Sequence, residues 1–194
     1  MPQVFLLKPG SILRDASGNI LDARSSVTLV ISGKTKMIVD TGQEGEEEKV
    51  LSALKSLDLR PKDIDTLINT HSHPDHCGNN RLFSGARILS PTEGVVIAPG
   101  VWIIETPGHS MDSISVAIKG PELVVIAGDA LPTFGNFQKN VPPAMHINRD
   151  LAVSSMAKIV AVADIVVPGH DFPFYVPERE YVRHSDIPAR IDRD

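Results

Sequence analysis

Thr70-His71-Ser72-His73-Pro74-Asp75-His76 is the stretch that organises this sequence, because it places four residues able to bind a metal ion within six positions. Three are imidazoles and one is a carboxylate, and such ligands suit zinc, iron or manganese. A strand would align His71 with His73 and a helix would align His73 with His76, so neither element presents all four together. We therefore predict a tight loop at a strand end, held by a rigid scaffold. A loop of solvated histidines is the alternative, but three of the seven histidines of the chain lie here.

The composition of the 194-residue chain, 42% hydrophobic and 22% charged, predicts one globular domain over residues 1–194. A net charge of −5 and the lack of a basic run argue against non-specific binding of nucleic acid. Cys77 is the only cysteine, so we expect no intrachain disulfide and a reducing, cytoplasmic location. Neither a signal-peptide pattern nor a run of roughly 18 apolar residues is present, so we expect no membrane segment. A homodimer is the oligomer to be considered first.

Hydrophobic spacing predicts an alternation of strands and helices. Helices are expected over residues 44–57 and 148–163, with a shorter one at 178–184. Strands are expected at residues 4–8, 26–32, 36–39, 65–69, 101–105, 113–119, 123–127 and 165–167. Residues 131–145 contain three prolines and a glycine, and they predict a long irregular loop of the kind that often carries function.

One pattern recurs along the chain: an apolar strand, a turn with glycine or proline, and then a residue that can bind a metal. It occurs at Asp40, His71, His109, Asp129 and His170. If these strand ends meet, they bring together five imidazoles and two carboxylates, namely those of His71, His73, His76, His109, His170, Asp75 and Asp129. Seven ligands exceed the four positions of a tetrahedral zinc site. They fit two metal ions that share a bridging carboxylate and a bridging hydroxide.

Taken in order, these segments resemble the five motifs of the metallo-β-lactamase-fold hydrolases. The matching segments are Val39–Gly42, Thr70–His76, Pro107–His109, Gly128–Asp129 and Pro168–His170. The resemblance extends over nearly the whole chain. It implies an α/β fold, a four-layer αββα sandwich in which two mixed β-sheets pack face to face with helices outside. Within this superfamily, the start of the chain and the segment Gly169–Phe174 are most similar to the group of metallo-β-lactamase domain-containing protein 1.

The same resemblance implies a role for each ligand and two divalent metal ions, with zinc expected first and iron or manganese as alternatives. The first ion would be bound by His71, His73 and His109, and the second by Asp75, His76 and His170. Asp129 would bridge the two ions. Asp40 would accept a proton from a ligand imidazole and fix its orientation.

A metal-dependent hydrolase is the function that this resemblance implies. A hydroxide between two ions would cleave a small ester, lactone, thioester or phosphodiester, and the open site could be promiscuous. Asp75 would be the catalytic residue that orients the attacking water and carries its proton. Two alternatives stay open. One is an RNA-directed phosphodiesterase, because the group that the chain most resembles has been linked to RNA. The other is a metal-binding scaffold without catalysis.

Two features narrow the substrate. Classical β-lactamases of the superfamily usually lack the bridging aspartate, so Asp129 argues against that activity. The 41 positions from Asp129 to His170 leave no room for the domain that nuclease members often insert there. A small molecule is therefore the expected substrate, and nucleic acid is not favoured.

Three further residues are candidates for substrate binding, all in the segment after Asp129. His146 could act as an acid or a hydrogen-bond donor, or it could be an exposed loop histidine. Phe134 and Phe137 could form a wall of the substrate pocket, or they could simply pack the loop against the protein.

Overall fold

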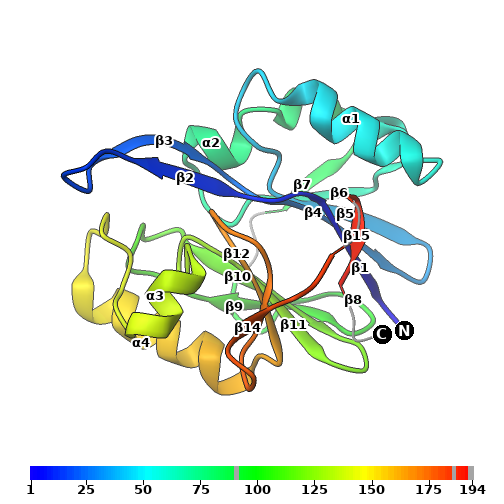
Figure 1. Ribbon diagram of the computed structural model, residues 1–194. Helices are drawn as coiled ribbons and strands as arrows, with labels where there is room; N and C mark the ends of the chain where they lie inside the picture. Colours follow the sequence, from blue (N-terminus) through cyan, green and yellow to red (C-terminus); the bar gives the residue numbers. More distant parts are fainter. Residues whose placement is uncertain (90–91, 185–186, 192–194) are drawn as a thin grey trace.

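The structure is a computed structural model that describes residues 1–89, 92–184 and 187–191. Its strands form two large mixed sheets that lie face to face (Figure 1). The first sheet has the order β15 (Ala189–Arg190), β1 (Gln3–Lys8), β4 (Val27–Ser32), β5 (Thr35–Val39), β6 (Thr66–Ile68), β7 (Arg87–Leu89). The second has the order β14 (Glu180–Tyr181), β13 (Phe174–Tyr175), β12 (Ile165–Pro168), β11 (Leu123–Gly128), β10 (Ile114–Lys119), β9 (Val101–Glu105), β8 (Val96–Ala98).

Three apolar clusters separate the layers, and period-two alternation along the strands generates them. In β9, Ile103 belongs to the cluster between the sheets, whereas Ile104 belongs to the cluster on the outer face. In β10, Val116 and Ala117 divide in the same way. Each large aliphatic side chain buried in this way stabilises the fold by about 1.5–3 kcal/mol.

Helices cover both outer faces, as Figure 1 shows. Helix α1 (Glu47–Ser56) places Val50 and Leu54 in the cluster on the outside of the first sheet. Helices α3 (Phe134–Lys139) and α4 (Arg149–Val162) cover the second sheet, and Met156 and Ile159 of α4 lie in its outer cluster. The four-layer αββα architecture expected from the sequence is therefore confirmed.

Two secondary-structure predictions for the part of the chain after Asp129 were wrong. Residues 131–145 do not form a purely irregular loop, because helix α3 lies within them, and the Thr133 side chain caps it by accepting a hydrogen bond from the Asn136 backbone. Residues 178–184 do not form a helix, because β14 pairs Tyr181 with Phe174 at the sheet edge.

A hairpin that the sequence pattern did not predict extends beyond the two main sheets. Strands β2 (Ser11–Arg14) and β3 (Ile20–Arg24) pair with each other in a separate two-stranded sheet, joined by the turn at Asp15–Asn19. In Figure 1 this hairpin reaches out above α3.

Short segments complete the description. The turns η1 (Pro61–Asp63) and η2 (Asn80–Phe83) are 3-10 helices, and α2 (Pro74–Cys77) is a single α-helical turn. None of the helices within the described ranges is long and apolar enough to cross a membrane.

Strand direction sets the position of the site. Strands β5 and β6 are parallel neighbours, and so are β11 and β12, so the carboxyl ends within each pair lie at the same edge of their sheet. Asp40 directly follows β5, Asp129 directly follows β11, and His170 follows β12 by one residue.

Candidate metal centre

The seven residues expected to bind metal form two adjoining groups. In each group, one possible ligand atom per residue lies within 4.8 Å of the others. The first group consists of His71, His73, His109 and Asp129, and the second of Asp75, His76 and His170. The chain therefore brings together side chains that lie up to 99 positions apart in the sequence.

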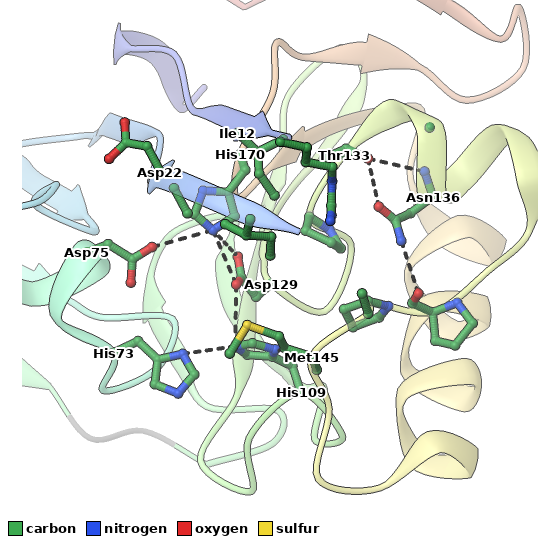
Figure 2. A pocket seen from close by; sticks show the side chains of 18 of the residues that line it. Ile12, Asp22, His73, Asp75, His109, Asp129, Thr133, Asn136, Met145 and His170 are labelled. Carbon is green, nitrogen blue, oxygen red and sulfur yellow. Dashed lines mark hydrogen bonds and ion pairs between the residues drawn. The ribbon is translucent and has the colours of Figure 1, made fainter. Parts of the chain in front are cut away.

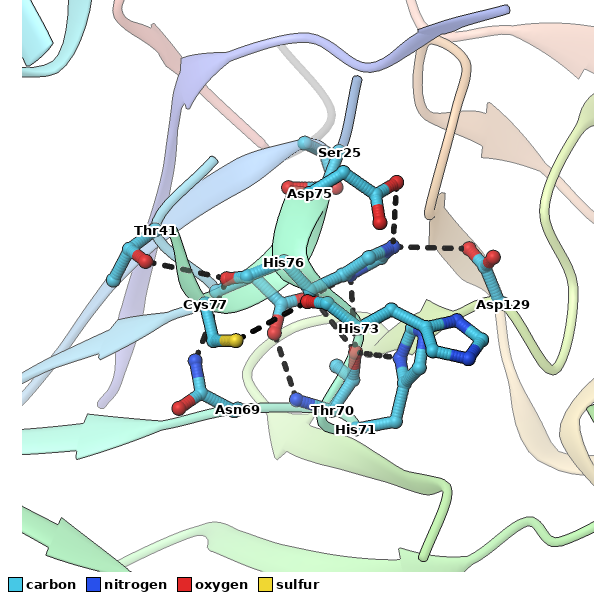
Figure 3. Close-up of polar contacts among 12 residues, drawn as sticks. Ser25, Thr41, Asn69, Thr70, His71, His73, Asp75, His76, Cys77 and Asp129 are labelled. Carbon is cyan, nitrogen blue, oxygen red and sulfur yellow. Dashed lines mark hydrogen bonds and ion pairs between the residues drawn. The ribbon is translucent and has the colours of Figure 1, made fainter. Parts of the chain in front are cut away.

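The local structure of the histidine stretch differs from the predicted loop. His71 lies in a turn after β6, but Asp75 and His76 belong to the one-turn helix α2 (Figure 3). Pro74 is the first residue of this helix, where its fixed φ is favourable and its missing N–H costs nothing. His73 is the N-cap, so its side chain points differently from that of His76.

Three imidazoles of the first group converge through one nitrogen each. Nδ1 of His73 lies 2.9 Å from Nε2 of His71 and 2.9 Å from Nε2 of His109. The three rings are close to perpendicular to one another, with interplanar angles of 77°, 87° and 88°. Ligands of a tetrahedral zinc ion lie about 3.3 Å apart. The spacing and the ring orientation therefore fit a single ion among the three nitrogens.

Asp129 lies between the two groups (Figure 2). Its Oδ2 is 3.3 Å from Nε2 of His109 in the first group. Its Oδ1 is 3.2 Å from Nε2 of His76 and 3.1 Å from Nε2 of His170 in the second group. Oδ2 of Asp75 is 3.5 Å from Nε2 of His170. One carboxylate thus faces both groups.

In four of the five imidazoles, the ring nitrogen that points away from the cluster lies within hydrogen-bond distance of an oxygen atom. Nδ1 of His109 donates to the Met145 carbonyl at 2.7 Å, and Nδ1 of His170 donates to the Arg24 carbonyl at 3.0 Å. Nδ1 of His76 lies 2.7 Å from Oδ2 of Asp40, and Nδ1 of His71 lies 3.1 Å from Oγ1 of Thr70. These partners place the proton on Nδ1 and leave the Nε2 lone pair directed into the cluster, as metal-binding histidines require.

The charges in the cluster favour a cation. Burial, together with the neighbouring His76 ring, lowers the pKa of His71 to about 2, so its lone pair is free. Burial opposes the ionisation of Asp129, but His76 and His170 outweigh it and hold the pKa of this carboxyl group well below its ordinary value. Burial also opposes a charge on His76, yet Asp40 and Asp129 raise its pKa. The same carboxylates that attract a proton to His76 would attract a metal ion.

Two buried atoms show that the donor set fits metal ions. Nε2 of His76 and Oδ1 of Asp129 are buried and lie 3.2 Å apart, but neither forms a hydrogen bond of normal geometry with the described residues. Buried polar atoms without a partner are costly and rare in native proteins. Metal ions coordinated by these atoms would satisfy both of them, with imidazole and carboxylate ligands of the kind that zinc, iron and manganese accept.

A pocket of about 820 Å³ leads to the cluster, and His73, Asp75, His109, Asp129 and His170 line its base. Residues of the β2–β3 hairpin line one side, and most residues of the segment 132–145 line the other. The pocket has the size of a small-molecule site.

The three candidate substrate-binding residues have other surroundings. Phe134 and Phe137 are buried in the outer cluster of the second sheet, where both rings contact Phe174 at centroid distances of 4.9 and 5.0 Å. His146 is exposed, and its Nδ1 bonds the Pro143 carbonyl at 2.7 Å. None of the three lines the pocket that reaches the cluster.

Other side chains do line this pocket, and the sequence pattern did not reveal them. They are hairpin residues such as Ile12 and Ile20, and Thr133, Asn136 and Met145 on the opposite side. The signal that could have identified the hairpin was the pair of isoleucines flanking the turn at Asp15–Asn19.

Comparisons with known proteins agree with the fold and the cluster. A family model of the metallo-beta-lactamase superfamily matches residues 22–99. The chain is 36% identical over 179 residues to a probable metallo-hydrolase of Methanocaldococcus jannaschii, a match that covers 87% of this chain and 86% of that protein. It is 33% identical over 194 residues to metallo-beta-lactamase domain-containing protein 1 of Xenopus laevis, with coverage of 90% and 80%.

A solved structure supports the same fold. It is an N-acyl homoserine lactone hydrolase with the product N-hexanoyl-L-homoserine bound at its catalytic metal center. The TM-score is 0.70 at 22% identity, and the alignment covers 87% of this chain and 93% of that one. Since the two sequence relatives share about a third of their residues with this chain along most of its length, and its five motifs meet in one His and Asp cluster, the chain belongs to the metallo-β-lactamase superfamily of metal-dependent hydrolases.

Proposed function

We propose that this protein is a dinuclear metallohydrolase that cleaves small esters and lactones, and that its site also accepts thioesters or small phosphodiesters. The observation that carries the proposal is the position of the pocket, whose base is formed by both groups of the cluster. The bond to be cleaved would then lie beside both ions. The lactone hydrolase of similar fold, with its product at a metal centre, supports lactones as one class to test.

Each residue of the cluster has a role in this proposal. His71, His73 and His109 would bind one ion, and Asp75, His76 and His170 the other, with Asp129 shared between them. Bound divalent ions of this kind supply a hydroxide nucleophile near neutral pH, because they lower the pKa of water to about 7. Zinc is the ion that we propose first, with iron and manganese as alternatives.

Asp75 is the residue to which we assign proton transfer. Its side chain is 23% exposed, lines the pocket and lies 3.5 Å from Nε2 of His170 through Oδ2. A carboxylate at the boundary between the cluster and the pocket can orient an attacking water and accept its proton. It can then return the proton to the leaving oxygen.

The pocket walls favour a small substrate over RNA. Apolar residues such as Ile12, Ile20, Val141 and Met145 line them, and Arg14 and Lys139 are the only arginine and lysine among the lining residues. A polynucleotide site needs a run of cations that follows the phosphate backbone.

A substrate panel tests the proposal. Chromogenic ester, lactone, thioester and bis(4-nitrophenyl) phosphate substrates are incubated with protein loaded with zinc, iron or manganese, and with metal-free protein. We expect hydrolysis of esters or lactones that depends on metal. Asp75→Asn should abolish turnover and weaken binding of one ion, whereas Asp150→Asn, exposed at the start of α4, should change neither.

The results separate the alternatives. Full activity of Asp75→Asn at full metal content would refute the role of Asp75. Hydrolysis of the phosphodiester alone would favour the RNA-directed activity. Failure to hydrolyse any substrate with two ions bound per chain would favour the scaffold without catalysis.

A further inference from the structure

The two walls of the pocket both begin at His170. On one wall, the carbonyl of Arg24 at the end of β3 accepts a hydrogen bond from Nδ1 of His170 at 3.0 Å. On the other, the carbonyl of Pro132, just before α3, accepts one from the His170 backbone at 2.7 Å. His170 is therefore a common starting point from which the length of each wall can be measured toward the mouth of the pocket.

The first wall, which the β2–β3 hairpin forms, has apolar side chains near His170 and a cationic side chain farther out. Register pairs Ser11 with Arg24 near His170, then Ile12 with Ala23, and finally Arg14 with Ile20. Ile12 and Arg14 are two residues apart and both line the pocket, whereas Leu13 between them does not. At about 3.3 Å per residue, Arg14 lies roughly 10 Å farther out than Ser11.

The second wall, which helix α3 forms, also has uncharged residues near His170 and a cationic side chain farther out. Thr133 caps α3 beside Pro132, and the pocket is lined by Gly135, Asn136 and Lys139 in turn. At 1.5 Å per residue, Lys139 lies about 9 Å along the helix from Thr133. Each wall therefore carries one cation about 9–10 Å along its strand or helix from the end beside His170, and Asp22 is the charged side chain that lines the stretch between.

Within the described part of the chain, neither of the two cations has a protein counter-ion. The ion pairs of residues 1–89, 92–184 and 187–191 include neither Arg14 nor Lys139. Nη1 of Arg14 donates to the Gly18 carbonyl at 2.8 Å, which holds the guanidinium on the hairpin and leaves its other N–H groups available. Asp22 also lines the pocket, but Nε of Arg24 holds its carboxylate at 2.7 Å.

We propose that Arg14 and Lys139 form an anion-binding subsite, and that the preferred substrate is an ester or lactone whose apolar chain ends in an anionic group. The scissile bond lies at the metal cluster, the chain lies along Ile12, Ile20 and Met145, and the anion lies between the two cations. A guanidinium and an ammonium both bind carboxylate and phosphate oxygens, and the charged hydrogen bonds are stronger than neutral ones. The substrate assignment rests on the proposed hydrolase function, whereas the subsite can be tested by binding alone.

The binding test uses compounds with a metal-chelating hydroxamate at one end. Suberic acid monohydroxamate carries a carboxylate at the other end, and its methyl ester has the same length without the charge. We expect the acid to bind zinc-loaded protein roughly tenfold more tightly than the methyl ester. Succinic acid monohydroxamate is too short to span the walls, so it should show no such preference over its own methyl ester. A phosphonate of the suberic length distinguishes a phosphate from a carboxylate subsite.

Matched variants assign the preference to the two residues. Arg14→Gln/Lys139→Gln should remove it. Lys62→Gln/Lys119→Gln, which lowers the net charge equally at exposed positions outside the pocket, should retain it. Raising the salt concentration should reduce the preference, because partly exposed charges are screened. Circular dichroism confirms that each variant is folded.

A hydrolysis assay tests the anion-binding subsite and the proposed hydrolase function separately. Mono(4-nitrophenyl) suberate and its methyl ester are compared by kcat/KM, and the same tenfold preference is expected. Equal hydrolysis of the two esters together with equal binding of the two hydroxamates would overturn the subsite and leave the hydrolase function standing. Tighter binding of the charged hydroxamate without hydrolysis of either ester would support the subsite and contradict the hydrolase. Preference retained in Arg14→Gln/Lys139→Gln would also overturn the assignment.

Discussion

The carboxylate of Asp40 holds the ring of His76, with Oδ2 2.7 Å from Nδ1, and both side chains are almost fully buried. Oδ2 also accepts a hydrogen bond from the Thr70 hydroxyl at 2.8 Å, and Thr70 Oγ1 lies 3.1 Å from Nδ1 of His71. Since the hydroxyl donates to Asp40, it accepts from His71. One carboxylate therefore orients an imidazole in each of the two groups, directly for His76 and through Thr70 for His71.

Asp40→Asn should weaken the binding of both metal ions. The Asn amide would direct N–H toward Nδ1 of His76, which then has to accept and would carry its proton on Nε2 instead. Loss of such a partner typically lowers metal affinity about 10–100-fold. The measurement is competition with a chromophoric chelator, with metal per chain read by elemental analysis. Asp58→Asn is the control, because this exposed residue has φ 57°, which asparagine tolerates. Unchanged metal affinity in Asp40→Asn would contradict the role of Asp40.

Gly169→Ala should displace Asp129. A methyl group at Gly169 would lie 2.2 Å from Oδ1 of Asp129 and 3.0 Å from the Gly128 carbonyl. We expect loss of bound metal and a decrease of about 1–3 kcal/mol in the free energy of unfolding. Gly85→Ala is the matched control, since nothing lies within 4 Å of the added methyl group. Wild-type metal content and urea stability in Gly169→Ala would show that the backbone adapts without moving the carboxylate.

Lys8→Met should destabilise the protein, because it leaves the carboxylate of Glu46 buried without its closest partner. The two side chains are 6% and 1% exposed and their charged atoms are 3.0 Å apart. Lys49 and Arg24 would still lie 3.1 and 3.5 Å from Oε1 of Glu46. We therefore expect a loss of roughly 1–3 kcal/mol in the free energy of unfolding, less than a buried charge without any partner would cost. The double variant Lys8→Met/Glu46→Leu removes both charges and should recover most of the lost stability in urea unfolding. If the single and double variants were equally unstable, the pairing would not be the cause.

The Lys8–Glu46 pair also predicts how the stability of the fold changes at acid pH. Burial alone would raise the pKa of Glu46, but the ammonium groups of Lys8 and Lys49 together outweigh it, so the pKa lies below the ordinary 4.5. Such a group stabilises the fold above its unfolded pKa, and this contribution is lost as the pH falls through the lower folded value. The free energy of unfolding of the wild type, relative to that of the double variant, should therefore decrease as the pH falls below about 4.5, in metal-free protein. A difference that stays constant across this range would rule out Glu46 as the group responsible.

Chelation should lower the melting temperature of metal-loaded protein. Ions that bind the folded cluster and not the unfolded chain stabilise the fold by mass action, by about 2.7 kcal/mol at a hundredfold excess over Kd. For a chain of this length the expected decrease is about 5–10 °C. Differential scanning calorimetry with EDTA, followed by readdition of zinc, checks this expectation. A melting temperature indifferent to both treatments would argue that the cluster binds no ion.

The sequence by itself determined the architecture and the identity of the clustered residues. Apolar runs of strand length, each followed by glycine or proline and a possible ligand, recur at Asp40, His71, His109, Asp129 and His170. Such patterns can be recognised in the sequence because strand periodicity and turn formation depend on residues that are close together in the chain. Their order along the chain resembles the five motifs of the metallo-β-lactamase-fold hydrolases, and this resemblance implied the αββα sandwich.

Only the tertiary structure decided which side chains form the pocket. Phe134 and Phe137 lie beside pocket residues in the sequence, yet the turn of α3 directs both into the core against Phe174. Ile12 and Arg14 lie far from the ligands along the chain, yet the hairpin brings them to the pocket. The orientation of each imidazole is also set by distant oxygens, such as the Arg24 carbonyl at His170. These relations depend on how sheets and helices pack over separations of up to 146 positions, and no local pattern in the sequence records such distances.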